Sequence, residues 1–338
     1  MSVLAIEAAG PGVTLQDGGR HGYLRFGITA AGAMDPLMFA TANRAVGNPL
    51  DATAVEISTG GLTVSASEGP LSIGVVSAGF RAALDGAALP MSCALTLEPG
   101  QTLTIRAGRA GAWGYLAVAG RLDVPPILGS TATHTRSALG GIDGRGLQAG
   151  DRLRVVGPRP GDMAPQRLRV PWLDRDASRI RVVLGPQDDY FSADEIAAFL
   201  TRSWTVSPRG DRMACFLDGM PLTHAKGHDI VSDGVAMGAI QVPGNGLPIV
   251  LMADRQSTGG YPKIATVIGP DLGRLAQVRG GGQIAFRQVS VAEAVAARRA
   301  ERDVLREPVA REPVVRAEFT SDFLLKLNLV GGVTDGRA

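Results

Sequence analysis

Residues 248–268 read PIVLMADRQSTGGYPKIATVI, in which two apolar runs enclose a polar loop that contains two glycines. The runs 249–252 and 264–268 have the length and composition of buried β-strands. The loop between them offers an acid, a guanidinium, an amide, hydroxyls and an ammonium within a few residues. Two core strands would hold these groups rigidly. The sequence therefore predicts either a ligand site at this loop or an ordinary hairpin with a polar tip.

The composition favours a mainly β protein with a few short helices. The 338 residues are enough for two domains of ordinary size. The 45 glycines and 21 prolines favour many turns and short strands over long helices. The formal net charge of +2 provides no electrostatic argument for nucleic acid or a membrane surface as the partner.

The cysteines and the apolar stretches bear on the compartment. Cys93 and Cys215 are the only cysteines and lie far apart, which argues against a disulfide framework and for a reducing environment. The first residues lack the basic region of a signal peptide, and no apolar stretch is long enough to span a bilayer. We therefore expect a cytoplasmic protein.

Capping residues mark the starts of three predicted helices. Asp35 stands before a proline, a combination typical of an N-cap followed by the first helical position. Ser192 with Glu195 predicts a capping box. Ser290 precedes a helical pattern over residues 291–305, which carries arginines on its polar face.

Strand-and-turn patterns fill two long segments, which predicts a tandem duplication of β-rich domains. Each segment has a charged turn near its start, at residues 17–20 and 209–212, and each closes with an alternating strand. We expect an N-terminal domain at 1–160, a C-terminal domain at 178–295 and a helical, arginine-rich extension at 296–338.

Several familiar catalytic motifs are absent. The chain contains no GxxxxGK[ST] loop for ATP phosphates, no HExxH or CxxC pattern for a metal, and no GxSxG. No metal site is predicted. None of the three lysines has the setting of a biotinylated lysine, so any biotin would arrive on another polypeptide. His134 lies alone in a threonine-rich loop, where a surface position is expected.

Short motifs spread over residues 3–293 form one further pattern. In chain order they occupy residues 14–17, 19–23, 32–36, 115–120, 124–126, 128–130, 211–213, 238–243 and 253–263. Together they resemble the biotin-dependent carboxyltransferase family, which includes the C subunit of bacterial 5-oxoprolinase, the kinase-inhibitor antagonist KipA and a region of urea carboxylase. Ser257, where this family commonly has threonine, is a small departure.

The resemblance implies a fold and a function. The fold is two tandem cyclophilin-like β-barrel domains. The function is that of the C subunit of an ATP-dependent 5-oxoprolinase, which opens 5-oxoproline to glutamate together with an A subunit and a KipI-like B subunit. One alternative is transfer of a carboxyl group from carboxybiotin, on a separate carrier, to urea or a related small amide. The other is a non-catalytic, KipA-like regulator that binds a KipI-like partner.

The candidate site residues centre on the loop that follows the strand at 249–252. Asp254 would accept a proton or orient an arginine, Arg255 would hold a carboxylate with its fork, and Tyr261 or Lys263 would stabilise negative charge. A purely structural Arg–Asp pair is the alternative. The glycines are expected to permit unusual backbone conformations and close approach of a ligand. The candidate substrate-binding residues are Asp17, Arg20, Arg136, Arg212, Gln256, Thr258, Gly259 and Gly260.

Overall fold

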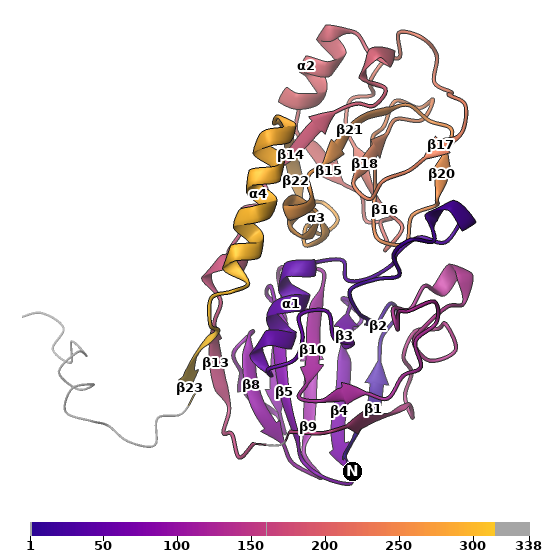
Figure 1. Cartoon of the computed structure of the whole chain (residues 1–338). Coiled ribbons are helices and arrows are strands. Elements are labelled where there is room, and N and C mark those ends of the chain that lie inside the picture. Colours follow the sequence, from indigo (N-terminus) through magenta and orange to yellow (C-terminus); the bar gives the residue numbers. More distant parts are fainter. Residues whose placement is uncertain (1, 160, 315–338) are drawn as a thin grey trace, which may run out of the picture.

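The computed structural model describes residues 2–159 and 161–314, which form two β domains joined side by side (Figure 1). The first domain consists of two seven-stranded sheets, and the second is a closed barrel. This confirms the mainly β fold in two tandem domains that the sequence predicts. Residues 315–338 of the expected C-terminal extension lie outside the described residues.

The first sheet of the N-terminal domain is antiparallel and has β1 near its middle. Side chains of β4 alternate between buried and half-buried, because one face packs on the core and the other meets solvent. Across the sheet the strands are β11 (Arg121–Leu122), β12 (Arg152–Val156), β1 (Ser2–Ala9), β4 (Leu62–Ser67), β9 (Thr102–Arg106), β6 (Arg81–Leu84) and β7 (Ala87–Leu89).

The second sheet faces the first across an aliphatic core. Its outer face is covered by α1 (Pro36–Ala45), so β5 and β10 are buried along their whole length. Asp35 caps α1 by accepting a hydrogen bond from the Met38 amide at 3.2 Å, as predicted. Across the sheet the strands are β2 (Thr14–Gln16), β3 (Ala54–Ile57), β10 (Gly114–Val118), β5 (Leu71–Ser77), β8 (Cys93–Leu97), β13 (Gln166–Arg169) and β23 (Ala310–Pro313).

The barrel of the second domain closes because β22 pairs with β14 in parallel and with β15 antiparallel. Its core includes Phe199 stacked on Phe286, with ring centroids 4.6 Å apart. A two-stranded arm of β17 (Asp233–Gly234) and β20 (Thr258–Gly259) projects from it (Figure 1). Around the barrel the strands are β14 (Arg179–Leu184), β21 (Lys263–Val267), β18 (Ala239–Gln241), β19 (Ile249–Leu251), β16 (Ala214–Asp218), β15 (Trp204–Val206) and β22 (Gln283–Gln288).

The remaining helices are short except for the last. Ser290 and Glu293 form a complete capping box on α4. Ser192 caps α2 through the Glu195 amide, but Glu195 Oε2 lacks a hydrogen-bond partner within the described chain, so the predicted box is half formed there. No helix in the described ranges is long and apolar enough to cross a bilayer. These helices are α2 (Ala193–Thr201), α3 (Gly269–Ala276) and α4 (Val291–Val304), with 3-10 turns η1 (Leu24–Phe26), η2 (Thr135–Ser137), η3 (Pro171–Leu173) and η4 (Asp188–Tyr190).

The segment between the domains contains a strand that the sequence pattern did not reveal. β13 joins the first domain by pairing with β8, and after α4 the chain returns to add β23 beside β13. In β13 only Leu168 is buried, so these four residues show too little alternation to be recognised.

Hydrogen bonds from the end of α3 fix the two domains against each other. Gln277 Oε1 accepts from the amides of Ala112 and Trp113 at 2.9 and 3.1 Å, and its Nε2 donates to Asp35 Oδ2 at 3.1 Å. The Arg279 guanidinium donates to backbone carbonyls of the first domain, including that of Gly111 at 2.6 Å. The space between the domains is therefore held open in a defined shape.

Candidate functional site

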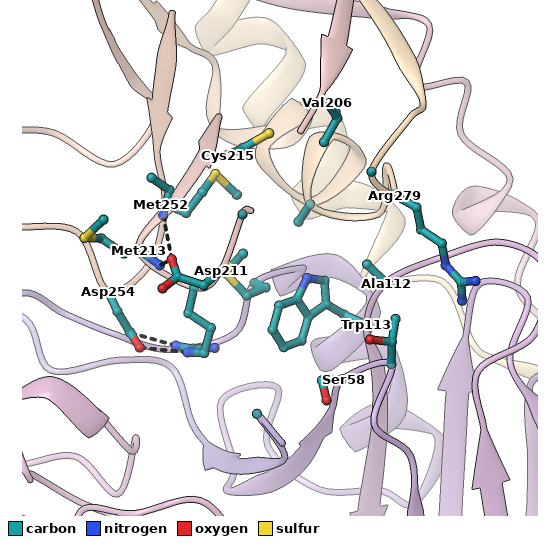
Figure 2. Close-up of a pocket in the computed structure, with 18 of the residues that line it drawn as sticks. Ser58, Ala112, Trp113, Val206, Asp211, Met213, Cys215, Met252, Asp254 and Arg279 are labelled. Carbon is teal, nitrogen blue, oxygen red and sulfur yellow. Dashed lines mark hydrogen bonds and ion pairs between the residues drawn. The ribbon is translucent and has the colours of Figure 1, made fainter. Parts of the chain in front are cut away.

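A cavity of about 680 Å³ lies between the two domains, lined by both (Figure 2). One wall is apolar, with the Trp113 indole from the first domain facing thioethers from the second. The charged lining residues are Arg136, Asp211, Arg212, Asp254 and Arg279. The predicted loop therefore reaches the cavity through its first residue, Asp254.

Arg212 and Asp254 form a buried, two-pronged ion pair at the edge of this cavity. The Nε and Nη2 atoms of Arg212 lie 2.9 Å from the two oxygens of Asp254, a contact drawn as dashed lines in Figure 2. Arg212 Nη2 also donates to the Gly32 carbonyl at 2.8 Å, and its Nη1 donates to Glu56. The arginine therefore bridges the domains.

Glu56 is itself fully buried and held by donors from the first domain. Its Oε2 accepts from the Tyr115 hydroxyl at 2.8 Å and from the Met34 amide at 2.7 Å. Burial raises the pKa of Glu56, and the neighbouring Arg212 opposes that shift. For Arg212, burial acts to lower the pKa, but Glu56 and Asp254 outweigh it and the net shift is upward. Arg212 is thus a permanent cation between two carboxylates.

This arrangement revises the predicted role of Arg212. We expected it to bind substrate, but Nε and both donors of Nη2 are taken by protein acceptors, and Nη1 also gives one bond. One Nη1 hydrogen is left for any ligand. Likewise, both oxygens of Asp254 accept from Arg212, so the arrangement corresponds to the orienting role foreseen for Asp254, which here is oriented by an arginine.

Arg255, the next residue, is in a different position. It is 9% exposed, and its Nε donates to the Val235 carbonyl at 2.9 Å. Within the described chain the guanidinium forms no ion pair with a carboxylate, and burial lowers its pKa. A buried cation without a counter-charge attracts an anionic ligand. Arg255 does not line the cavity but follows directly on Asp254, which does.

Lys263 is the second buried cation of the loop. It opens β21 at 2% exposure, and its Nζ lies 3.0 Å from Asp233 Oδ2 on the arm strand β17. The hydrogen bond from Lys263 lowers the pKa of Asp233, whose carboxylate is half exposed. The arm therefore covers the lysine in this structure.

The other loop residues divide between surface and arm. Tyr261 is 41% exposed, and Gln256 Nε2 donates to Gln241 Oε1 at 3.4 Å. Thr258 and Gly259 form β20. Neither Gly259 nor Gly260 has a positive φ, so the expectation of an unusual backbone was wrong. Gly259 is needed for space instead, because an added Cβ would lie 2.3 Å from the Gln241 amide nitrogen.

Asp17 and Arg20 hold the loop around residue 130 in place. Asp17 accepts from Ser130 Oγ at 2.7 Å and from the Thr131 amide at 2.6 Å. Arg20 is 1% exposed and donates to carbonyls of that same loop, including that of Ala132 at 3.0 Å. Burial lowers the pKa of Arg20. Both side chains, predicted to bind substrate, are therefore engaged by the protein.

Arg136 and His134 come from the same loop but differ in exposure. Arg136 is exposed and lines the cavity. His134 is buried, so its expected surface position was wrong. Its Nδ1 accepts from the Ser137 amide at 3.2 Å, which leaves the proton on Nε2, 3.1 Å from Thr29 Oγ1. Burial lowers the pKa of His134, which favours the neutral ring.

The residues that the sequence reasoning missed are those whose partners lie far away along the chain. Glu56 interrupts the otherwise apolar strand AVEI, a signal for a buried charge. Gln241 and Tyr115 stood out only as parts of motifs, and Asp233 had no signal. In the described ranges, no group of three or more His, Cys, Asp or Glu side chains is placed to hold a metal ion.

Comparisons with known proteins agree with the motifs. The family model described as "Carboxyltransferase domain, subdomain A and B" matches residues 26–288. The chain is 40% identical to the C subunit of 5-oxoprolinase from Escherichia coli over 88% of this chain and 94% of that protein. It is 37% identical to the Haemophilus influenzae protein of the same name, over 85% and 91%.

Larger proteins contain a similar region. Urea amidolyase of Saccharomyces cerevisiae is 31% identical over 85% of this chain, which spans 17% of that protein. The solved urea amidolyase of Kluyveromyces lactis has a TM-score of 0.82 at 27% identity, covering 90% of this chain and 20% of that one. The resemblance inferred from the motifs is confirmed, and the chain belongs to the carboxyltransferase-domain family, subdomains A and B.

Proposed function

We propose that this chain acts as the C subunit of an ATP-dependent 5-oxoprolinase, together with A and B subunits. Identity of 40% over 94% of the E. coli 5-oxoprolinase C subunit supports the assignment. The structural observation that carries it is Arg255, a buried guanidinium with no carboxylate partner in the described chain. 5-Oxoproline carries a carboxylate, which suits a planar, forked donor.

The loop divides the chemistry between its two buried cations. Arg255 binds the substrate carboxylate, and Lys263 stabilises negative charge that develops on the lactam oxygen. For this, the Lys263 ammonium turns from Asp233 toward the substrate. Asp254 acts by position: its bond to Arg212 fixes the backbone that presents Arg255. Tyr261, exposed beside the arm, lies where it can contact bound substrate.

The partners supply what this sequence lacks. No phosphate-binding loop motif occurs in the chain, so we assign ATP to the assembled complex and no cofactor covalently to this polypeptide. The B subunit, of KipI-like fold, is the proposed direct partner, and the A subunit provides the remaining part of the reaction.

The assignment is tested by reconstitution. The purified chain alone, with ATP and 5-oxoproline, should release no glutamate, and addition of A and B subunits should give release of both glutamate and ADP. Size-exclusion chromatography at micromolar concentration should show this chain eluting with the B subunit. Turnover by the single chain, or inactivity of the three subunits together, would contradict the proposal.

Carboxyl transfer is the second candidate, favoured by one observation. The TM-score of 0.82 to a urea amidolyase extends over 90% of this chain. In this reaction the chain would take a carboxyl group from carboxybiotin on a separate carrier protein and pass it to urea or a small amide. Incubation with a carboxybiotinyl carrier and labelled urea decides between them, since 5-oxoprolinase activity alone should leave the carrier's carboxyl group in place.

A further inference from the structure

Gln241 presents a buried amide that the described chain leaves half satisfied. It ends β18 at 2% exposure and pairs in the barrel with Lys263 of β21. Its Oε1 accepts from Gln256 Nε2 at 3.4 Å, whereas its Nε2 has no hydrogen-bond partner in residues 2–159 and 161–314. Burying a donor without an acceptor costs free energy. An acceptor brought by a ligand would remove that cost.

The surrounding chain keeps this amide in one orientation. Gln256 occupies Oε1, so turning the amide over would set two NH₂ groups against each other. A Cβ added to Gly259 would lie 2.3 Å from Gln241 Nε2 and 3.3 Å from Val235 Cγ2. Glycine at this position therefore leaves room for the amide, and a larger residue would displace it.

Three donors of different kinds surround Val235 and the arm. Arg255 Nε donates to the Val235 carbonyl, Gln241 Nε2 lies against Gly259 of the arm, and Lys263 Nζ reaches Asp233 of the arm. A guanidinium, an amide N–H and an ammonium together suit a small ligand rich in acceptor oxygens. A molecule with both a carboxylate and an amide carbonyl has that chemistry.

From this geometry we infer that Gln241 is a substrate-binding residue, which donates Nε2–H to the carbonyl oxygen of the ligand while Arg255 holds its carboxylate. The inference rests on the proposed function and adds a specificity determinant to it. Two donors at opposite ends of the ligand fix which end faces Lys263. A ligand lacking the carbonyl would leave the Gln241 donor buried and unpaired, and would bind poorly.

The test is Gln241→Met in the assembled complex, which removes the donor and keeps the length of the side chain. The value of kcat/KM for 5-oxoproline should fall about 100-fold, the loss typical of one donor to a developing oxyanion. The melting temperature should stay level or rise, because an unpaired amide is replaced by an apolar group. Gln288→Met, at an exposed position of β22, is the matched control and should change neither quantity.

A second variant approaches the same contact from the other side. Gly259→Ala should displace the amide and lower kcat/KM as well. Wild-type kcat/KM in Gln241→Met overturns the inference, and so does a melting temperature well below that of the wild type, since that would make the amide part of the fold. Absence of turnover by the wild-type complex contradicts the proposed function instead. The melting temperatures of Gln241→Met and wild type then decide the inference by the same criterion.

Discussion

Glu56 of the first domain and Arg212 of the second form a buried ion pair across the domain boundary. Arg212 carries the link onward to Asp254, at the start of the loop that presents Arg255. Two carboxylates share one guanidinium here, so the orientation of the domains and the position of the loop depend on the same contacts. Glu56 holds its place because Tyr115 and Met34 donate to its other oxygen.

Replacement of Glu56 by glutamine should destabilise the chain by about 3 kcal/mol, because it leaves a buried arginine with one carboxylate fewer. Unfolding in guanidinium chloride measures the change. Glu68→Gln is the control, since Glu68 pairs with Arg152 on the surface, where such pairs contribute about 1 kcal/mol or less. Equal effects of the two substitutions would show that the interdomain pair carries no special weight.

The conservative change Arg255→Lys should lower kcat/KM of the assembled complex about tenfold or more, equivalent to about 1.4 kcal/mol of transition-state stabilisation. Lysine keeps the charge but loses the fork that grips a carboxylate. The melting temperature should change little, because the guanidinium donates to one backbone carbonyl and forms no ion pair with any described residue. Arg121→Lys, at an exposed ion pair, should leave activity intact. A loss of stability that matches the loss of activity would make Arg255 structural.

Local sequence patterns predicted much of the fold. The apolar runs around residues 249–268, the N-cap at Asp35 and the capping box at Ser290 all depend on neighbours within a few residues. Such signals are readable because helix and strand periods repeat over short distances. β13 was missed because its edge position buries one residue only.

The candidate site was predicted in part, for a different physical reason. Its loop was found because unlike polar groups cluster there, but the partners of those groups depend on the tertiary fold. Arg212 and Glu56 are 156 residues apart in the chain. Gly259 was expected to serve the backbone, yet the Gln241 amide beside it explains the glycine. Packing of this kind leaves no periodic trace in a sequence.

His134 should make stability depend on pH below neutrality. Burial lowers its pKa in the folded state, so the unfolded chain binds this proton more readily. Stability contributed by the neutral ring is therefore complete above about pH 6.5, the usual histidine pKa, and is lost as the pH falls through and below that value. Thermal melts from about pH 7.5 down to about pH 5 should show the loss, and His134→Gln should reduce it. His228→Gln, at an exposed ring, should leave the profile unchanged, and a wild-type profile in His134→Gln would contradict the assignment.

Lys263→Met should separate catalysis from stability most clearly. The ammonium is buried, while its partner Asp233 is half exposed and stays hydrated when the lysine is removed. Methionine fills a similar volume without a buried charge, so the free energy of unfolding should stay within about 1 kcal/mol of the wild type or rise. The kcat of the complex should fall about 100-fold, because the charge proposed to stabilise the lactam oxygen is gone. Lys226→Met removes an ammonium from a comparable pair with Asp189, exposed on both sides, and should leave kcat unchanged. If both variants keep wild-type kcat, Lys263 is a structural residue whose ammonium serves only to hold the arm strand β17.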